Sequence, residues 1–272
     1  MKLNKHQPIG VFDSGIGGLT VANAISKLLP NEKLIYFGDT AHLPYGDKSA
    51  RAIKQYSYII SDFLIEKGCK AIVVACNSAT SVSYPFLREL YKDDIHIFGV
   101  IRPVVRAVIQ DDSIQKIGII GTQATVQSGI YELLFKQEKP NLQTVSLATP
   151  LLAPMIEAGF ASNQTIDGVL KYYLERDEFH GIDALILACT HYPLIKDKIA
   201  TLLPPSVKIF DNTTFVAREV QLELERLYLL NDKNGGEHEF YVSDYTESFE
   251  QTTQIFYGKK INLELANIWK NS

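Results

Sequence analysis

Two stretches of sequence, AIVVACNSAT at residues 71–80 and ALILACTHYP at residues 184–193, decide the fold. Each begins with a short unbroken apolar run, which is typical of a strand buried on both faces of a parallel sheet. Each run ends at a cysteine, Cys76 or Cys189, and a polar segment that can open a helix follows it. The two stretches therefore predict two equivalent strands, each with a thiol at its carboxyl end.

Similar apolar runs recur along the chain and alternate with segments of helical periodicity. They predict strands over residues 9–13, 33–38, 71–75 and 96–100, and again over residues 116–121, 144–148, 184–188 and 207–210. This alternation is the signature of βαβ units and a parallel sheet. The sequence thus predicts an α/β protein of two halves that meet near Gly99. A long helix from Thr213 to about Leu229 and a strand from Phe240 to Ser243 should follow.

The two predicted halves are weakly similar in sequence. IGVFDS at residues 9–14 matches IGIIGT at residues 117–122, and the two cysteine stretches follow at similar offsets. A duplicated fold accounts for both matches. Because ligands bind at the carboxyl ends of the strands in open α/β sheets, duplication predicts that Cys76 and Cys189 approach one cleft from opposite sides.

Composition and charge exclude several classes of protein. The chain has 272 residues, of which 46% are hydrophobic and 21% charged, as expected for a globular protein of two modest domains. The formal net charge of -4 and the lack of a Lys/Arg cluster argue against a nucleic-acid partner. The opening MKLNKHQP has no signal-peptide core, and no run of about eighteen apolar residues occurs. We therefore expect a cytoplasmic protein with no membrane partner.

The three cysteines, Cys69, Cys76 and Cys189, are too dispersed for a disulfide framework and form no zinc-type pair. Cys69 is predicted to be a buried core residue. Cys76 and Cys189 should each precede a helix, whose unpaired N–H groups and dipole lower a thiol pKa from its usual value of about 8.5. We expect both of these thiols to be reactive. The histidines have no spacing that suggests a metal site.

Two thiols facing one cleft suit the inversion of a stereocentre next to a carboxylate without a cofactor. One group removes the Cα proton from one face while the other delivers a proton to the opposite face, and the roles exchange in the reverse direction. The carbanion that forms needs preorganised hydrogen-bond donors. Candidate donors, each of which could instead serve only as a helix cap, are Ser14, Asn77, Ser78, Thr122 and Thr190, with the backbone N–H groups of residues 15–18.

Two further residues can tune the thiols. Asp13 ends the first predicted strand and could orient the Cys76 thiol or hold a substrate ammonium group. His191 lies two positions after Cys189, and a neighbouring imidazolium lowers a thiol pKa. The segment GDTAHLPYG at residues 38–46 is rich in turn-forming residues and follows the second predicted strand, so it should border the same edge unless it is only a surface loop. We predict that Asp13, Cys76, Cys189 and His191 are catalytic.

Five ordered blocks of the sequence resemble those of the glutamate racemase family. They are VFDSGIGGL at residues 11–19, YFGDT at 36–40 with PYG at 44–46, VACN at 74–77, GTQAT at 121–125 and LACTHYPL at 187–194. Any one block is a weak signal. Five in the family's order, spread over most of the chain, are highly specific.

The resemblance implies two pseudo-symmetric α/β domains with mainly parallel sheets and an active site in the cleft between them. It places the first domain at residues 1–98 plus 212–272 and the second at residues 99–211. It also implies that Cys76 and Cys189 interconvert L- and D-glutamate without a cofactor, in a homodimer that supplies D-glutamate for peptidoglycan in a bacterial cytoplasm. The family's substrate contacts correspond to Asp13, Ser14, Tyr45, Gly46, Asn77, Ser78, Thr190 and His191.

Two positions depart from the family pattern. Ser78 stands where family members commonly carry Thr, which preserves the hydroxyl group. Arg102 stands where they often carry Glu before the proline, here Pro103. This change leaves contacts between the domains, or regulation in that region, undetermined.

Three alternative functions remain open from the sequence. Aspartate racemases resemble the same superfamily and would use the same two thiols. A dinucleotide-dependent oxidoreductase is suggested by Gly15 and Gly17 after a first strand and Asp39 after a second, although Thr20 stands where the third glycine should be. A thiol-redox or non-catalytic role would leave Cys76 and Cys189 unnecessary for racemisation.

Overall fold

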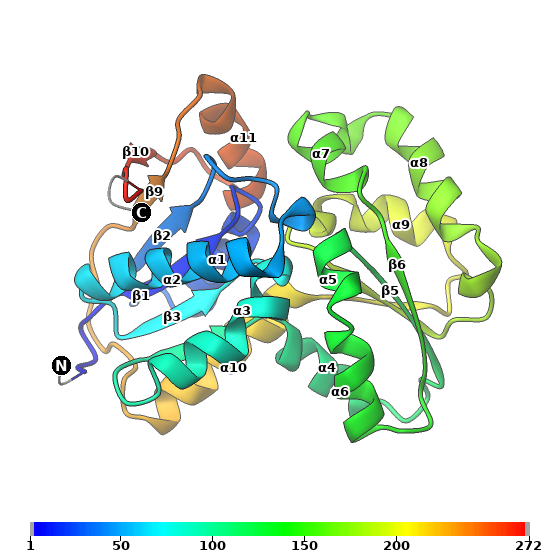
Figure 1. Cartoon of the computed structure of the whole chain (residues 1–272), viewed down its shortest axis with the longest axis horizontal. Helices are drawn as coiled ribbons and strands as arrows, with labels where there is room; N and C mark the ends of the chain where they lie inside the picture. Colours follow the sequence, from blue (N-terminus) through cyan, green and yellow to red (C-terminus); the bar gives the residue numbers. More distant parts are fainter. Residues whose placement is uncertain (1–2, 270–272) are drawn as a thin grey trace.

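The computed structural model describes residues 3–269, except for the side chains of residues 247, 248, 250 and 251. Figure 1 shows two lobes side by side, each built on one sheet. The first sheet contains β1 (Ile9–Asp13), β2 (Leu34–Gly38), β3 (Ala71–Val74), β4 (His96–Gly99), β9 (Glu239–Val242) and β10 (Glu264–Leu265). The second contains β5 (Lys116–Gly121), β6 (Gln143–Ala148), β7 (Ala184–Ala188) and β8 (Lys208–Asp211). Every predicted strand is therefore confirmed, and its ends move by at most one residue.

The two sheets share one strand order. The first runs β10-β9-β2-β1-β3-β4 and the second β6-β5-β7-β8, and every strand pair of the described residues is parallel. In each half the strands follow the order second, first, third, fourth, so β1 corresponds to β5 and β3 to β7. The predicted α/β fold of two pseudo-symmetric halves is confirmed. In such a sheet the chain turns in opposite directions beyond the first and third strands, and ligands bind in the crevice between their carboxyl ends.

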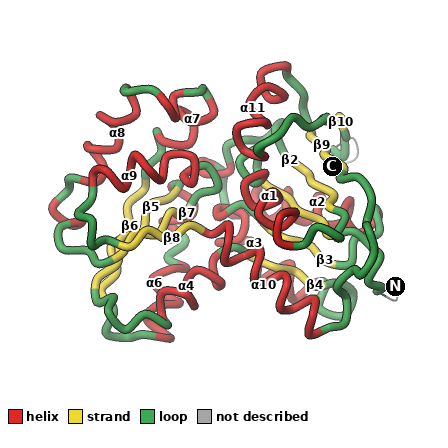
Figure 2. The backbone as a smooth tube through the Cα atoms, turned by 180° about the vertical axis from the view of Figure 1, so that it is seen from behind, coloured by secondary structure: helices red, strands yellow, loops and turns green. Residues whose placement is uncertain are grey.

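Helices cover both faces of each sheet, as the view from behind in Figure 2 also shows. Around the first sheet lie α1 (Leu19–Leu28), α2 (Ala50–Glu66), α3 (Asn77–Leu90), α10 (Asn212–Arg226) and α11 (Glu247–Tyr257). Around the second lie α4 (Ile101–Ile109), α5 (Gln123–Gln127), α6 (Ile130–Glu138), α7 (Leu152–Glu157), α8 (Thr165–Leu174) and α9 (Lys196–Leu202). The long helix predicted after Thr213 is α10, which ends three residues earlier than expected.

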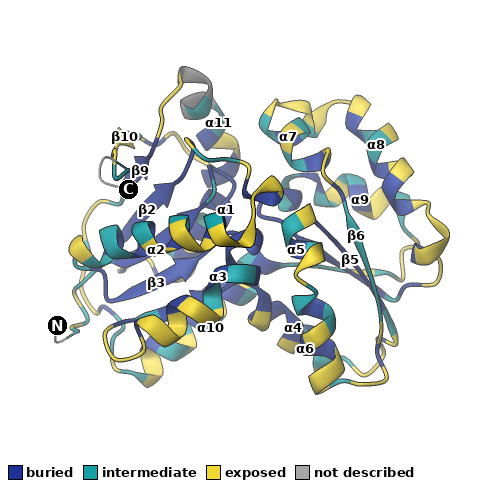
Figure 3. Ribbon diagram, in the orientation of Figure 1, coloured by how far each residue is buried: buried dark blue, intermediate teal, exposed yellow. Residues whose placement is uncertain are grey.

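The strands that lead to the two cysteines are buried along their whole length, as are β1 and β2. Their apolar runs have no polar face because helices cover both sides of the sheet. Strand β6 lies at a sheet edge and is only partly buried, which Figure 3 shows in teal beside the dark blue central strands. Burial therefore holds most firmly the strands that end at the thiols.

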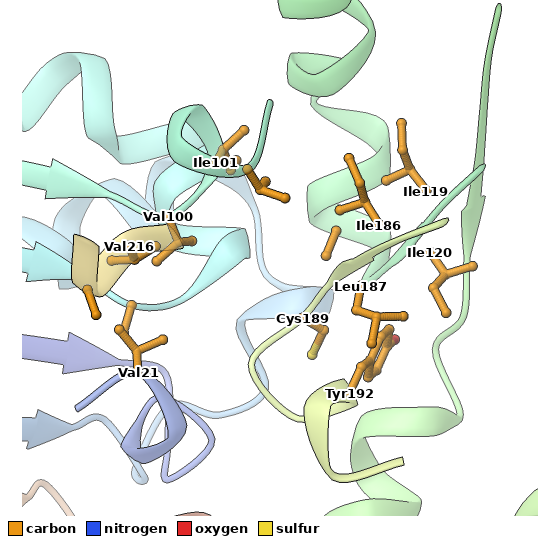
Figure 4. Packing of buried hydrophobic residues seen from close by; sticks show 14 of the residues in the cluster. Val21, Val100, Ile101, Ile119, Ile120, Ile186, Leu187, Cys189, Tyr192 and Val216 are labelled. Atoms are coloured by element: carbon orange, nitrogen blue, oxygen red, sulfur yellow. The ribbon is translucent and has the colours of Figure 1, made fainter. Parts of the chain in front are cut away.

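The chain crosses between the lobes twice, through α4 after β4 and into α10 after β8. Helix α4 packs against both α10 and α6, so it contacts both lobes. One continuous cluster of buried apolar side chains extends from Val21, Val100 and Val216 on the first side to Ile186 and Leu187 on the second (Figure 4). This apolar joint holds the two sheets in a fixed position relative to each other, because separating them would expose the cluster to water.

A buried ion pair closes the amino end of the first sheet. Lys70 Nζ lies 2.6 Å from Glu32 Oε2, and both side chains are almost completely buried. Lys70 Nζ also donates to the Lys5 carbonyl oxygen, and Glu32 Oε1 accepts from the Asn231 N–H. The pair thereby ties the N-terminal segment, the start of β3 and the connection from α10 to β9 together.

Lys70→Met is expected to lower the free energy of unfolding by about 3–5 kcal/mol, because it leaves the Glu32 carboxylate buried without a counter-charge. Equilibrium denaturation with urea measures the loss. Lys92→Met, which removes the exposed partner of Glu89, is the matched control and should change stability little. Equal losses in the two variants would contradict the assignment.

Candidate active site

A small cavity of about 140 Å³ lies between the lobes. It is lined by Ser14, Leu43, Pro44, Tyr45, Gly46, Cys76, Asn77, Ser78, Thr122, Ala153, Pro154, Glu157, Cys189, Thr190 and His191. The residues that the sequence assigned to the site are among them, apart from Asp13 and the glycine turn at residues 15–18. The residues after β1, β3, β5 and β7 thus converge as the shared strand order requires.

Cys76 is the N-cap residue of α3. Its Sγ accepts a hydrogen bond from the Ala79 N–H at 3.4 Å and lies 3.6 Å from Ser14 Oγ. Only 5% of the residue is exposed. The thiol is thus held at the start of a helix and lines the cavity, but it is almost removed from bulk water.

Burial, and to a smaller extent the neighbouring Asp13 carboxylate, raise the pKa of Cys76 to about 12. The Ala79 N–H and the Ser14 hydroxyl act in the opposite direction, but their effect is smaller. The expectation that the helix N-terminus would lower this pKa is therefore wrong, because desolvation of the thiolate outweighs the helix dipole. At neutral pH Cys76 is a thiol that can give up a proton.

A variant with Cys76 as its only thiol, made by Cys69→Ser and Cys189→Ser, is expected to show almost no thiolate at pH 8. The raised pKa keeps the proton on sulfur until the solution is strongly alkaline, whereas a thiol with an unshifted pKa would be partly ionised at pH 8. Ultraviolet thiolate absorbance, measured against the same variant carrying Cys76→Ser as well, follows the titration. A midpoint near 9 would contradict the assigned environment.

Cys189 has a different setting from the one that the sequence predicted. A turn and a 3-10 helix (Tyr192–Ile195) follow it, and α9 begins only at Lys196. The expected helix start directly after Cys189 is therefore wrong. Pro193 has no N–H to donate within an α-helix, and the local bonds instead link residues three apart, as from the Tyr192 N–H to the Cys189 carbonyl.

The sulfur of Cys189 is paired with a histidine instead of a helix end. His191 Nδ1 lies 3.5 Å from Cys189 Sγ, and His191 Nε2 lies 2.8 Å from Glu157 Oε1. Burial alone lowers the pKa of His191, but the charges and hydrogen bonds of Cys189 and Glu157 outweigh it and raise the pKa well above 6.5. His191 is therefore an imidazolium at neutral pH, with one N–H directed at each partner.

Glu157 is a site residue that the sequence analysis missed. It ends α7, the short helix that follows β6, and no spacing in the sequence marks it. The pseudo-symmetry of the halves does indicate that the segment carrying Glu157 lies near the site. Strand β6 corresponds to β2, whose following segment carries Tyr45, so the segment after β6 should also reach the cavity.

Glu157→Gln is expected to lower the pKa of His191, because the substitution removes a negative charge and keeps the shape of the side chain. His191 would then lose its proton at a lower pH. Nuclear magnetic resonance titration of the imidazole ring measures the change. Glu138→Gln, on the exposed end of α6, is the control and should leave the titration where it is; an unshifted titration in Glu157→Gln would contradict the pairing.

Asp13 is fully buried behind the glycine turn and does not line the cavity. Its Oδ2 accepts from the N–H groups of Gly18 at 2.9 Å and Gly15 at 3.3 Å. Burial raises the pKa of Asp13, while the His191 charge and these two N–H groups oppose the increase. The carboxylate thus occupies the N–H groups that a dinucleotide pyrophosphate would need, and its predicted role toward Cys76 stays a prediction.

The segment after β2 forms one wall of the cavity. Tyr45 donates its O–H to Asp39 Oδ2 at 2.6 Å, and Ser243 donates to Asp39 Oδ1 at 2.7 Å. Asp39 is therefore engaged in holding this loop and is not free for a ribose. A Cβ at Gly46 would lie 2.9 Å from Thr122 Cβ in the other lobe, so only glycine fits here without displacing Thr122.

The two lobes also touch through polar groups at the cavity. Ser78 Oγ and Thr122 Oγ1 are 2.7 Å apart, and Thr20 Oγ1 donates to the Thr190 carbonyl oxygen at 3.1 Å. A Cβ at Gly17 would lie 2.5 Å from His191 Cε1, which explains why the turn after β1 carries glycine there. These contacts hold the two lobes together beside the cavity.

Among the side chains that the structure describes within residues 3–269, no group of three or more from His, Cys, Asp or Glu is arranged to hold a metal ion. Over the same part of the chain, no helix combines the length and the apolar character needed to cross a membrane.

Two thiols at equivalent strand ends of the two pseudo-symmetric α/β halves line one cavity between the lobes, and comparison with known proteins identifies the class as a racemase. The sequence model of the Asp/Glu/Hydantoin racemase family matches residues 10–220. A glutamate racemase of Streptococcus pneumoniae (strain Hungary19A-6) is 37% identical over 261 residues, which cover 95% of this chain and 98% of that protein.

Solved structures give the same result. The glutamate racemase of Francisella tularensis, determined in complex with D-glutamate, matches with a TM-score of 0.91 and 37% identity over 97% of this chain and 99% of its own. A glutamate racemase isoform of Bacillus anthracis matches with a TM-score of 0.91 and 35% identity over 97% and 98%. The chain belongs to the Asp/Glu/Hydantoin racemase family, and within it to the glutamate racemases.

Proposed function

We propose that this chain interconverts L-glutamate and D-glutamate, with Cys76 and Cys189 as the two acid/base groups. The observation that carries the proposal is the convergence of both thiols on one cavity from equivalent strands of the two halves. The relatives named above are glutamate racemases, and one of them was determined with D-glutamate bound. The residues of the site and the family of the chain therefore both support this function.

Each thiol serves one face of the substrate Cα. In the direction in which Cys189 is the base, its thiolate takes the Cα proton while the Cys76 thiol delivers a proton to the opposite face. The enzyme then holds a thiol at Cys189 and a thiolate at Cys76, which is the starting state for the reverse direction. One proton leaves the carbon and one returns, so no oxidant or reductant is consumed.

The remaining lining residues bind and orient the substrate. The hydroxyl, amide and backbone N–H donors at Ser14, Asn77, Ser78 and Thr190 suit its carboxylates and the carbanion that forms at Cα. Tyr45 and Gly46 supply the opposite wall. The His191 imidazolium can exchange a proton with Cys189, and Asp13 lies behind the turn that carries Ser14. These roles make the predicted site residues one functional unit.

The proposal includes the wider setting that the family resemblance implies. We assign the first domain to residues 1–98 plus 212–272 and the second to residues 99–211; residues 1–2 and 270–272 of the first lie outside the described structure. The protein would act as a homodimer in a bacterial cytoplasm and supply D-glutamate for peptidoglycan.

Protein freed of pyridoxal phosphate and metal is expected to form D-glutamate from L-glutamate. Cys76→Ser and Cys189→Ser should each lower kcat by at least about 10²-fold, because each removes a general acid/base group. Cys69→Ser, outside the cavity, is the control and should keep full activity. Chiral chromatography measures the product. Activity on aspartate alone, or unchanged turnover in both cysteine variants, would overturn the proposal.

Exchange of the Cα hydrogen with solvent distinguishes the roles of the two thiols. Because the two enantiomers have equal energy, any variant must lower kcat/KM equally in both directions. Exchange with deuterated water can nevertheless proceed on one face alone. Cys76→Ser should impair exchange from one enantiomer more than from the other, and Cys189→Ser should show the opposite preference. The same preference in both variants would contradict the two-face arrangement.

A further inference from the structure

Asn77 occupies a junction between the two lobes. It is the first residue of α3, it lines the cavity beside Cys76, and only 3% of it is exposed. Its Oδ1 accepts two hydrogen bonds, from the Tyr131 O–H at 2.9 Å and from Asn212 Nδ2 at 2.8 Å. Tyr131 belongs to α6 of the second lobe, and Asn212 opens α10 where the chain returns to the first.

In the structure the Asn77 amide presents its oxygen to both donors, while Asn212 Oδ1 has no hydrogen-bond partner among the described residues. Both donors converge on the Asn77 oxygen, so the oxygen faces the junction and the nitrogen faces away from both donors. Burial raises the pKa of Tyr131, so its phenol keeps the O–H that it donates. Asn77 Nδ2 has no hydrogen-bond partner among the described residues. A buried amide donor left without a partner is unfavourable, and it favours a ligand that supplies an acceptor.

We propose that Tyr131 and Asn212 are positioning residues that fix the Asn77 carboxamide so that its nitrogen is free to donate to a carboxylate of the substrate. This inference rests on the proposed function, since glutamate supplies the carboxylate. Neither residue lines the cavity, so both act through Asn77.

The arrangement makes substrate affinity depend on how the lobes meet. Tyr131 reaches Asn77 from the opposite lobe, and Ser78 next to it meets Thr122 of the same opposite lobe at 2.7 Å. If the lobes separated, Asn77 would lose one of the two donors that hold its oxygen, and its amide could turn. The start of α3 therefore presents its donors correctly only when the lobes are together.

The test is a double-mutant cycle on KM. Tyr131→Phe removes one O–H and preserves the ring, and we expect it to raise KM for glutamate roughly five- to tenfold with kcat changed by less than about twofold. Asn212→Ala should act in the same direction. In an Asn77→Ala background, neither substitution should raise KM further, because residues that act through a third lose their effect when it is removed.

Tyr91→Phe is the matched control. Tyr91 is also buried and donates its O–H to a side chain, Asp62, but it lies outside the cavity. It should change thermal stability about as much as Tyr131→Phe and leave KM unaltered. An equal rise in KM in the wild-type and Asn77→Ala backgrounds, or stability loss in Tyr131→Phe without a change in KM, would overturn the proposal.

A measurement of substrate binding tests this inference independently of the proposed function. Calorimetry of D-glutamate with protein carrying Cys76→Ser and Cys189→Ser needs no turnover, and Tyr131→Phe should weaken its Kd by the same five- to tenfold factor, roughly 1 kcal/mol. If the wild type binds glutamate but does not racemise it, the proposed function is wrong, and the binding measurement still tests the positioning role. If the wild type racemises but Tyr131→Phe binds normally, only the positioning role fails.

Discussion

The site depends on one geometric constraint, which is that two parallel sheets of the same strand order present their carboxyl ends to each other across a shared apolar joint. Parallel strands end at one edge of a sheet, so the residues after β1 and β3 must lie together, as must those after β5 and β7. The joint through α4 and α10 then sets the distance between the two edges. Without it, the lining residues would form two shallow crevices instead of one cavity.

Closing the cavity changes the chemistry of the groups that line it. Removal of water makes the charged form of each group costly unless a partner stabilises it. Cys76 has only a hydroxyl and a backbone N–H near its sulfur, and it remains a thiol. His191 lies between a sulfur and the Glu157 carboxylate, and it remains charged. Two cysteines that look equivalent in the sequence therefore have different surroundings, although the fold relates them by pseudo-symmetry.

The sequence predicted the strands more accurately than the segments between them. Buried strands are read from unbroken apolar runs, and this signal is local, so even their ends were placed within one residue. The segment after Cys189 was predicted to open a helix, but it forms a turn and a 3-10 helix around Pro193. Helix α11 and strand β10 were not predicted, and β10 has only two residues, too few to show an apolar pattern.

The sequence by itself determined the α/β class, the duplication and most of the residues that line the cavity. The class and the duplication follow from apolar periodicity, and the residues directly after the strands follow from the rule that ligands bind at strand ends. Tyr45 and Gly46 were assigned from the family resemblance. Only the tertiary structure decided that Glu157 supports His191, that Asp13 lies behind the lining, and that Tyr131 and Asn212 hold Asn77. Such contacts join residues far apart in the chain, and a pKa is set by burial and by charges that only the folded chain brings together.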